Sequence, residues 1–174
     1  MRAMRVSRRQ VSVVLVLITT LLGQVGVASP LPTPTHRPIL TISGKIKRTN
    51  SGDTAQFDRL MLEALGTTEI ETTTPWYTGK VRFEGVSLKR LMEYVESEGK
   101  TVVAIALNDY TTEIPIEDFA KFGTILALKR NGEYMAVRDK GPLFIIYPFD
   151  SKSELKSQTY YGRSAWQVTK LMVK

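Results

Sequence analysis

The sequence predicts an α+β fold in a single domain. Many short segments have the apolar runs or the alternation typical of strands, whereas only a few have apolar residues at helical spacing. The two kinds of segment do not alternate regularly along the chain, which argues against a doubly wound sheet. Residues 29–174 are also of a length that suits one hydrophobic core.

The first residues are predicted to be an export signal. They begin with four basic residues, Arg2, Arg5, Arg8 and Arg9. The apolar run at 11–22 is shorter than the roughly 20 residues of a membrane-spanning helix, and Gly26-Val27-Ala28 forms a small-residue cleavage site. We therefore expect residues 1–28 to be a signal peptide, and the mature protein to be periplasmic or otherwise exported, with no stable membrane span. An uncleaved anchor is the alternative.

The export route is left open by the sequence. Ser7-Arg8-Arg9 is compatible with a twin-arginine signal, the route of proteins that fold around a cofactor before export. The residues after the arginine pair differ from the usual pattern of that signal. The general secretory route is therefore the alternative.

Composition excludes several classes of function. The formal net charge is +7, but four of the 24 basic residues lie in the predicted signal, and the remaining 20 basic and 17 acidic residues leave only +3. Because both signs are interspersed, we do not expect nucleic-acid binding. The chain has no cysteine, which excludes disulfides, thiolate metal sites and cysteine nucleophiles.

Residues 29–38 are predicted to be a proline-rich spacer, and residues 39–174 to be the folded domain. His36 is the single histidine and lies in this spacer. We expect its side chain to be solvated and to act neither as a ligand nor as a base.

The first half of the domain is expected to contain two helices and several strands. Apolar residues predict a first strand over 39–46, followed by a turn at 50–53. A helix over 54–65 follows, ended by Gly66, with an apolar stripe of Phe57, Leu60, Met61 and Ala64. The remaining expectations are an extended segment over 67–74, a loop over 75–79, a turn at Gly85 preceded by the apolar Val81 and Phe83, and a helix over 88–97 capped by Ser87.

The second half begins with a buried strand over 102–107 and a short helix near 117–122. The stretch 125–148 predicts a strand, an Asn131-Gly132 turn, a second strand, a charged loop and a final apolar strand from Leu143. Residues 151–163 are expected to be polar and irregular. Alternation over 166–173 predicts a closing strand.

Several spaced motifs resemble one known family. Tyr110-Thr111-Thr112-Glu113-Ile114-Pro115 is similar to the Tyr-x-x-Ser-Ile-Pro segment of sulfite oxidases. Further similarities follow the family order: Phe83 to Leu88, Leu126-Ala127, Asn131-Gly132, and Arg138 to Pro142. Together they resemble the molybdopterin-binding fold shared by sulfite oxidases and periplasmic methionine sulfoxide reductases, over Ile39 to Val173. The resemblance implies a sulfite-oxidase-like fold with mixed β-sheets.

The same comparison shows departures where the family holds its cofactor. The cysteine that ligates molybdenum would fall near Thr73, and a threonine alcohol is a hard, neutral substitute for a soft thiolate. Phe144 and Ala165 stand where sulfite oxidases carry an arginine and a lysine. Molybdopterin is thus a possible cofactor by resemblance alone, and we expect no metal ligand from the protein.

Eight residues are candidates for binding a cofactor: Thr73, Trp76, Asn108, Asp109, Tyr110, Arg138, Asp139 and Lys140. Of these, Tyr110 and Arg138 are also candidate catalytic residues. Each has a structural alternative: Tyr110 as a buried ring with its hydroxyl on a backbone carbonyl, and Arg138 with Asp139 as a loop pair. Trp76 is either a lid on the core or a platform at a pocket mouth.

A carboxylate cluster of Glu113, Glu117 and Asp118 suggests either acid–base work or helix capping.

Three functional hypotheses follow. The first is an exported domain without molybdenum ligation by the protein, which binds a small ligand or a partner protein. The second is a periplasmic molybdopterin-dependent oxidoreductase whose metal is held only by its pterin, with Tyr110, Arg138 and Lys140 near the substrate. The third is an accessory sensory module for a membrane signalling protein. Whether the protein is an enzyme is left open.

Overall fold

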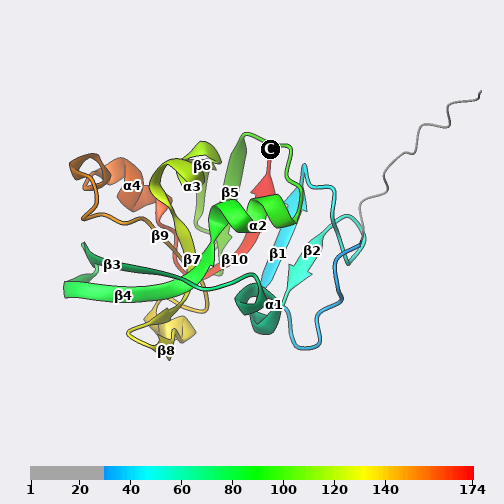
Figure 1. Cartoon of the computed structure of the whole chain (residues 1–174), viewed down its shortest axis with the longest axis horizontal. Helices are drawn as coiled ribbons and strands as arrows, with labels where there is room; N and C mark the ends of the chain where they lie inside the picture. Colours follow the sequence, from blue (N-terminus) through cyan, green and yellow to red (C-terminus); the bar gives the residue numbers. More distant parts are fainter. Residues whose placement is uncertain (1–29) are drawn as a thin grey trace, which may run out of the picture.

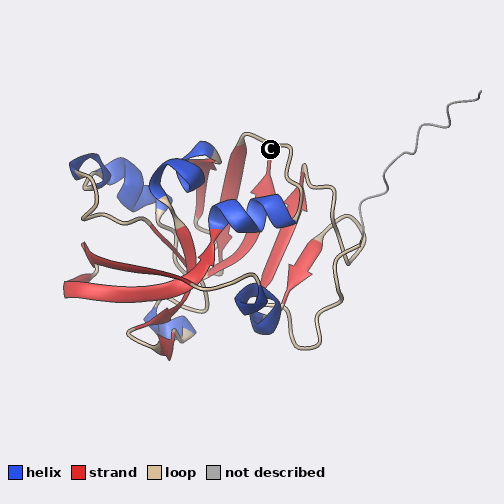
Figure 2. Ribbon diagram, in the orientation of Figure 1, coloured by secondary structure: helices blue, strands red, loops and turns tan. Residues whose placement is uncertain are grey.

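The computed structural model describes residues 30–174 and contains two five-stranded sheets with short helices around them (Figure 1). The predicted signal peptide lies outside the described residues. Figure 2 shows mixed sheets with a few short helices, so the predicted α+β fold class is confirmed. No helix within 30–174 is long and apolar enough to cross a membrane.

The first sheet has the strand order β2-β1-β10-β5-β6. Its members are β1 (Leu40–Gly44), β2 (Ala55–Phe57), β5 (Thr101–Ala106), β6 (Thr111–Pro115) and β10 (Val168–Val173). β1 and β10 pair in parallel, and every other pair is antiparallel. The chain therefore closes with its last strand in the middle of the sheet.

The second sheet has the order β3-β4-β7-β8, with β9 also paired to β7. Its strands are β3 (Thr68–Thr74), β4 (Tyr77–Ser87), β7 (Ile125–Arg130), β8 (Glu133–Tyr134) and β9 (Phe144–Ile146). β3 and β4 form a long hairpin with a two-residue turn at Pro75 and Trp76, which extends away from the first sheet (Figure 1). The turn is shorter than the predicted loop because β4 already begins at Tyr77.

Short helices connect the strands. They are α1 (Arg59–Ala64), α2 (Leu88–Tyr94), α3 (Glu117–Phe122), α4 (Gln158–Arg163) and the 3₁₀ turns η1 (Val137–Asp139) and η2 (Ser153–Leu155). The Ser87 hydroxyl caps α2 as predicted, and Leu88, Leu91 and Met92 bury its apolar face in the main core. The short helix predicted at 117–122 coincides with α3.

The predicted helix over 54–65 is wrong in its first half. Ala55–Phe57 instead form β2, which pairs with β1 from Leu40 opposite Phe57. The helix begins only after the cap residue Asp58, and this shift changes its buried face. Leu62 is buried, while Leu60 is 55% exposed.

Two further predictions are corrected. Gly85 lies inside β4 at a register shift and is not in a turn, and a Cβ there would clash with the carbonyl oxygen of Leu126. Residues 151–163 are not irregular, because they contain η2 and α4. Sequence patterns missed α4 because none of its six residues is buried and no apolar stripe marks it.

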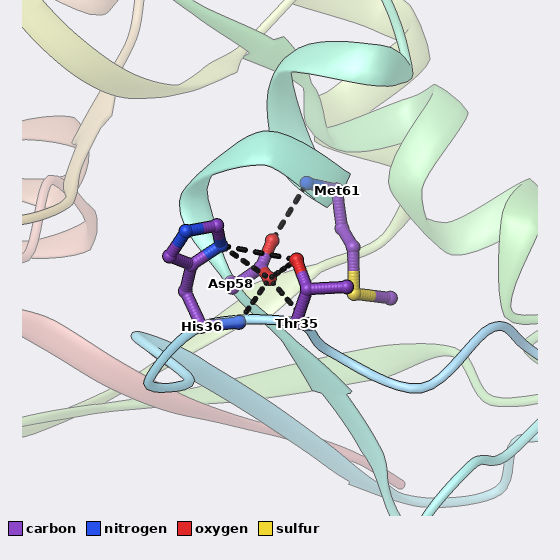
Figure 3. A network of polar contacts seen from close by, with 4 residues as sticks. All are labelled: Thr35, His36, Asp58 and Met61. Atoms are coloured by element: carbon purple, nitrogen blue, oxygen red, sulfur yellow. Dashed lines mark hydrogen bonds and ion pairs between the residues drawn. The ribbon is translucent and has the colours of Figure 1, made fainter.

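The segment before β1 packs on the domain. Leu31 is buried in the main core, and the Asn50 side chain donates to the Pro32 carbonyl. The buried carboxylate of Asp58 binds the residues that follow (Figure 3). Its Oδ1 accepts a hydrogen bond from the Met61 amide at 2.9 Å, which caps α1. Its Oδ2 accepts from the amides of Thr35 at 2.9 Å and His36 at 3.0 Å. Burial raises the pKa of Asp58, but these amide donors outweigh burial and lower it below its usual value. The His36 side chain is 68% exposed, as predicted.

Candidate functional site

A cavity of about 330 Å³ lies where the β3–β4 turn, the loop before β6, α4 and the residues before β10 meet. Its lining is aromatic and polar: Trp76, Asn108, Tyr110, Gln158, Tyr161, Gly162, Ser164 and Trp166. We call it the aromatic pocket. None of these lining residues carries a formal charge. Three of the eight candidates, Trp76, Asn108 and Tyr110, are thus brought together here.

Trp76 is the centre of an aromatic cluster that forms the pocket floor. Its ring centroid lies 5.2 Å from Phe144, 5.7 Å from Trp166 and 6.1 Å from Tyr161. The contacts with Trp166 and Tyr161 are edge-to-face, a favourable geometry for aromatic pairs. Trp76 is partly buried, so it both covers the core and faces the pocket.

Tyr110 forms one wall of the pocket and ties two elements together. Its hydroxyl donates a hydrogen bond to the Gly162 carbonyl in α4 at 2.9 Å. The ring is nevertheless 47% exposed. The structural alternative for Tyr110 is therefore correct about the hydroxyl and wrong about burial.

The other wall, α4, is held by a charged contact beneath the pocket. Arg163 Nη1 lies 2.8 Å from Asp118 Oδ2 of α3, and the Tyr147 hydroxyl donates to the same oxygen at 2.8 Å. Burial, with the hydrogen bond to the Asp118 carboxylate, raises the pKa of Tyr147 far above its usual value. Tyr147 therefore stays a neutral donor, and the network fixes the position of α4.

The carboxylates of Glu113, Glu117 and Asp118, which the sequence suggested as a cluster, do not form one network. Asp118 is used in this network, while Glu113 on β6 pairs with Lys174 at 2.7 Å. Within residues 30–174, no group of three or more acidic, histidine or cysteine side chains could hold a metal ion. The structure thus gives no support to an acid–base cluster of Glu113, Glu117 and Asp118.

Thr73 lies in β3, three residues before Trp76, and its polar groups are already bonded. Its hydroxyl donates to Asp150 Oδ1 at 2.6 Å, and its amide donates to Oδ2 at 2.7 Å. Lys156 Nζ lies 2.7 Å from the same carboxylate. The ammonium of Lys156, followed by the Thr73 donors, holds the pKa of Asp150 well below its usual range.

Phe144 and Ala165, which the resemblance places where sulfite oxidases carry cations, are buried. Phe144 is 0% exposed and packs 6.0 Å from both Phe83 and Trp166 between ring centroids, and Ala165 is 1% exposed. A phosphate needs paired charge or backbone donors, and a soft thiolate is missing at Thr73. The residues present therefore do not fit a thiolate-ligated molybdenum with a phosphate-bearing pterin.

The remaining candidates lie outside the pocket lining. Asp139 forms a bidentate pair with Arg130, at 3.1 and 2.7 Å, so the predicted pairing of Arg138 with Asp139 is wrong. Arg138 is exposed and has no hydrogen bond or ion pair with any residue of the described part of the chain. Asp109 is exposed with a left-handed φ of 62°. Lys140 Nζ lies 4.2 Å from the ring centroid of the lining residue Trp166, and Lys140 itself is not among the lining residues.

Five lining residues were missed by sequence reasoning: Gln158, Tyr161, Gly162, Ser164 and Trp166. Four lie in or next to α4, within the segment expected to be irregular or just after it. The pair Tyr160-Tyr161 was the available signal, because two adjacent aromatics in a polar stretch are unusual for a free loop. Trp166 was recognised only as a residue of the closing strand.

The comparisons with known proteins agree with the fold. The family model of the oxidoreductase molybdopterin-binding domain matches residues 39–149. The chain therefore belongs to the oxidoreductase molybdopterin-binding domain family. No curated protein matches it. The matched residues include Trp76, Asn108 and Tyr110, whereas the α4 side of the pocket and Trp166 lie beyond them.

Proposed function

We propose that this protein is an exported, small-ligand-binding member of its family that does not ligate molybdenum through its own side chains. The observation that carries the proposal is the aromatic pocket, in which tryptophan and tyrosine rings face a cavity of about 330 Å³ lined by uncharged residues. Ligand pockets are typically concave and apolar, with a few polar groups that fix orientation. Asn108, Gln158 and Ser164 supply such groups.

The ligand that fits best is a flat, uncharged ring system. Stacking on aromatic side chains contributes on the order of 1–3 kcal/mol for a planar base, and the side-chain amides of Asn108 and Gln158 both donate and accept hydrogen bonds. An anionic group would be buried without a paired cation, which is costly. Lys140 packs on the Trp166 ring but is not among the lining residues.

Tryptophan fluorescence offers a direct test, because the two tryptophans of the chain, Trp76 and Trp166, both line this pocket. The matched probes are an uncharged pterin and the same pterin carrying a phosphate. We expect the uncharged pterin to change the emission and to bind at least about tenfold more tightly, a difference of about 1.4 kcal/mol. Equal or tighter binding of the phosphate form would contradict the proposal.

The rival function is a molybdopterin-dependent oxidoreductase in which only the pterin holds the metal. Family membership and the position of Tyr110 favour it. It also requires Arg138 and Lys140 near the substrate, yet neither lines the pocket. Reduction of sulfoxides or oxidation of sulfite with dye coupling, lost in Tyr110→Phe or Arg138→Ala, would favour this rival.

A role as an accessory module for a membrane signalling protein stays a prediction of the sequence. Co-purification with a specific membrane protein, dependent on the aromatic pocket, would be its first support.

A further inference from the structure

A second concave surface lies beside the aromatic pocket and shares no lining residue with it. It is an apolar groove of about 410 Å³, lined by Arg37, Pro38, Ile39, Leu40, Thr41, Leu107, Val137, Pro142, Thr169 and Lys170. We call it the basic groove. It brings together four separate segments: the start of β1 with the residues before it, the residue after β5, the stretch from η1 to Pro142, and β10.

The groove exposes large apolar side chains that the fold does not need. Leu107 is 52% exposed and Val137 is 50% exposed, and they rank with the most exposed large hydrophobic residues of 30–174. Single exposed apolar residues are ordinary, but two in one concavity indicate an interaction surface. Neighbouring backbone contacts hold both in place, since Gln167 accepts from the Leu107 amide and donates its side-chain amide to the Val137 carbonyl.

The charge of the groove has one sign. Arg37 and Lys170 line it, and no acidic side chain does. Neither cation has a hydrogen bond or ion pair with another residue of the described chain, unlike Lys47, Arg163 and Lys174, which are paired. Arg138, next to Val137 in η1, is likewise exposed and unpaired within 30–174.

We propose that the basic groove docks an acidic, apolar peptide segment of a partner protein. The apolar floor accepts an aliphatic or aromatic side chain, and the cations at its edge select flanking carboxylates through charge complementarity. A concave surface suits a peptide better than a flat lipid headgroup layer. Because Leu107 and Asn108 are consecutive and line the groove and the pocket respectively, the docked peptide lies beside the ligand site.

The test uses the mature protein and two fluorescent synthetic peptides, one of alternating glutamate and leucine and one of alternating lysine and leucine. We expect saturable binding of the acidic peptide alone. Reversing both cations, Arg37→Glu with Lys170→Glu, should weaken it roughly tenfold, since edge charges act on both association and affinity. Leu107→Ser should weaken binding of the acidic peptide severalfold. Because the Leu107 side chain is exposed, the fold should tolerate this change.

Lys80→Glu is the matched control, because Lys80 is an exposed, unpaired cation of β4 outside the groove lining. It should keep wild-type binding, with circular dichroism confirming the fold of every variant. Equal loss in Lys80→Glu would mean unspecific charge attraction and would overturn the proposal. So would a wild-type dimer that Leu107→Ser dissociates, or binding to phosphatidylglycerol vesicles in place of the acidic peptide.

Discussion

Thr73 and Trp76 are three residues apart at the end of the same hairpin, yet their side chains have opposite fates. The hydroxyl and amide of Thr73 are both bonded to Asp150, so this position has no donor left for a ligand. The Trp76 ring remains open to a cavity. The family fold is therefore retained although the polar groups of Thr73 are used in internal hydrogen bonds, while the ring of Trp76 stays accessible to a ligand.

The largest effect is expected from Asp118→Ala, which removes the contact that holds α4 against the aromatic pocket. It leaves Arg163 and the buried Tyr147 hydroxyl without their shared partner, and removing one partner of a buried charged network costs about 3 kcal/mol. Urea unfolding measures the loss. Because α4 carries the pocket wall, ligand-induced fluorescence change should fall as well. A variant as stable as wild type would show that this network does not hold α4.

Trp166→Ala should weaken binding of the uncharged pterin by about tenfold or more, since it removes one stacking surface of the pocket. Trp76 remains as the fluorescent reporter. Tyr134→Ala is the control, because Tyr134 is an exposed aromatic residue outside the pocket lining. Similar losses of affinity in both variants would show that the pterin does not bind in the aromatic pocket.

Low pH should weaken the contacts between Thr73 and Asp150 more than it weakens the aromatic pocket. The pKa of Asp150 is lowered in the folded state, so its stabilisation is present above its unfolded pKa and is lost as the pH falls below about 4. Asp150→Asn should therefore flatten the decline of the urea midpoint between pH 5 and pH 3. Asp58 shows the same direction of shift, so part of the decline should persist in the variant. If the urea midpoint of Asp150→Asn fell with pH as steeply as that of the wild type, Asp150 would not contribute to the acid sensitivity.

Tyr110→Phe should have the smallest effect. It removes one hydrogen bond to Gly162 at an exposed position, with a net cost of about 0.5–1 kcal/mol. The ring remains, so we expect the affinity for the uncharged pterin to stay within about threefold of wild type. A complete loss of binding or turnover would instead give the hydroxyl a chemical role.

The parts of the fold that sequence predicted are those specified locally. The apolar stripe of α2 and its Ser87 cap lie within one short segment, and so does α3 after Pro115. β2 was missed because Ala55–Phe57 becomes a strand only through its pairing with β1. Helical spacing within that segment therefore gave the wrong answer.

The site was predicted in part, for the same reason. A family motif located Tyr110, and Trp76 and Asn108 were also candidates; all three line the pocket. The partner of Asp139 could not be found, because Arg130 reaches it across a hairpin and Arg138 merely neighbours it in sequence. The bonds from Thr73 to Asp150 join residues 77 positions apart in the chain and leave no local pattern.

The most direct test of the central claim is the ratio of molybdenum and pterin to protein. The protein should be purified from cells that make the molybdenum cofactor, with a molybdoenzyme from the same cells as the positive control. Because Thr73 is bonded to Asp150 and Phe144 and Ala165 fill the cation positions, we predict molybdenum far below one atom per chain. One molybdenum and one pterin per chain would contradict the account.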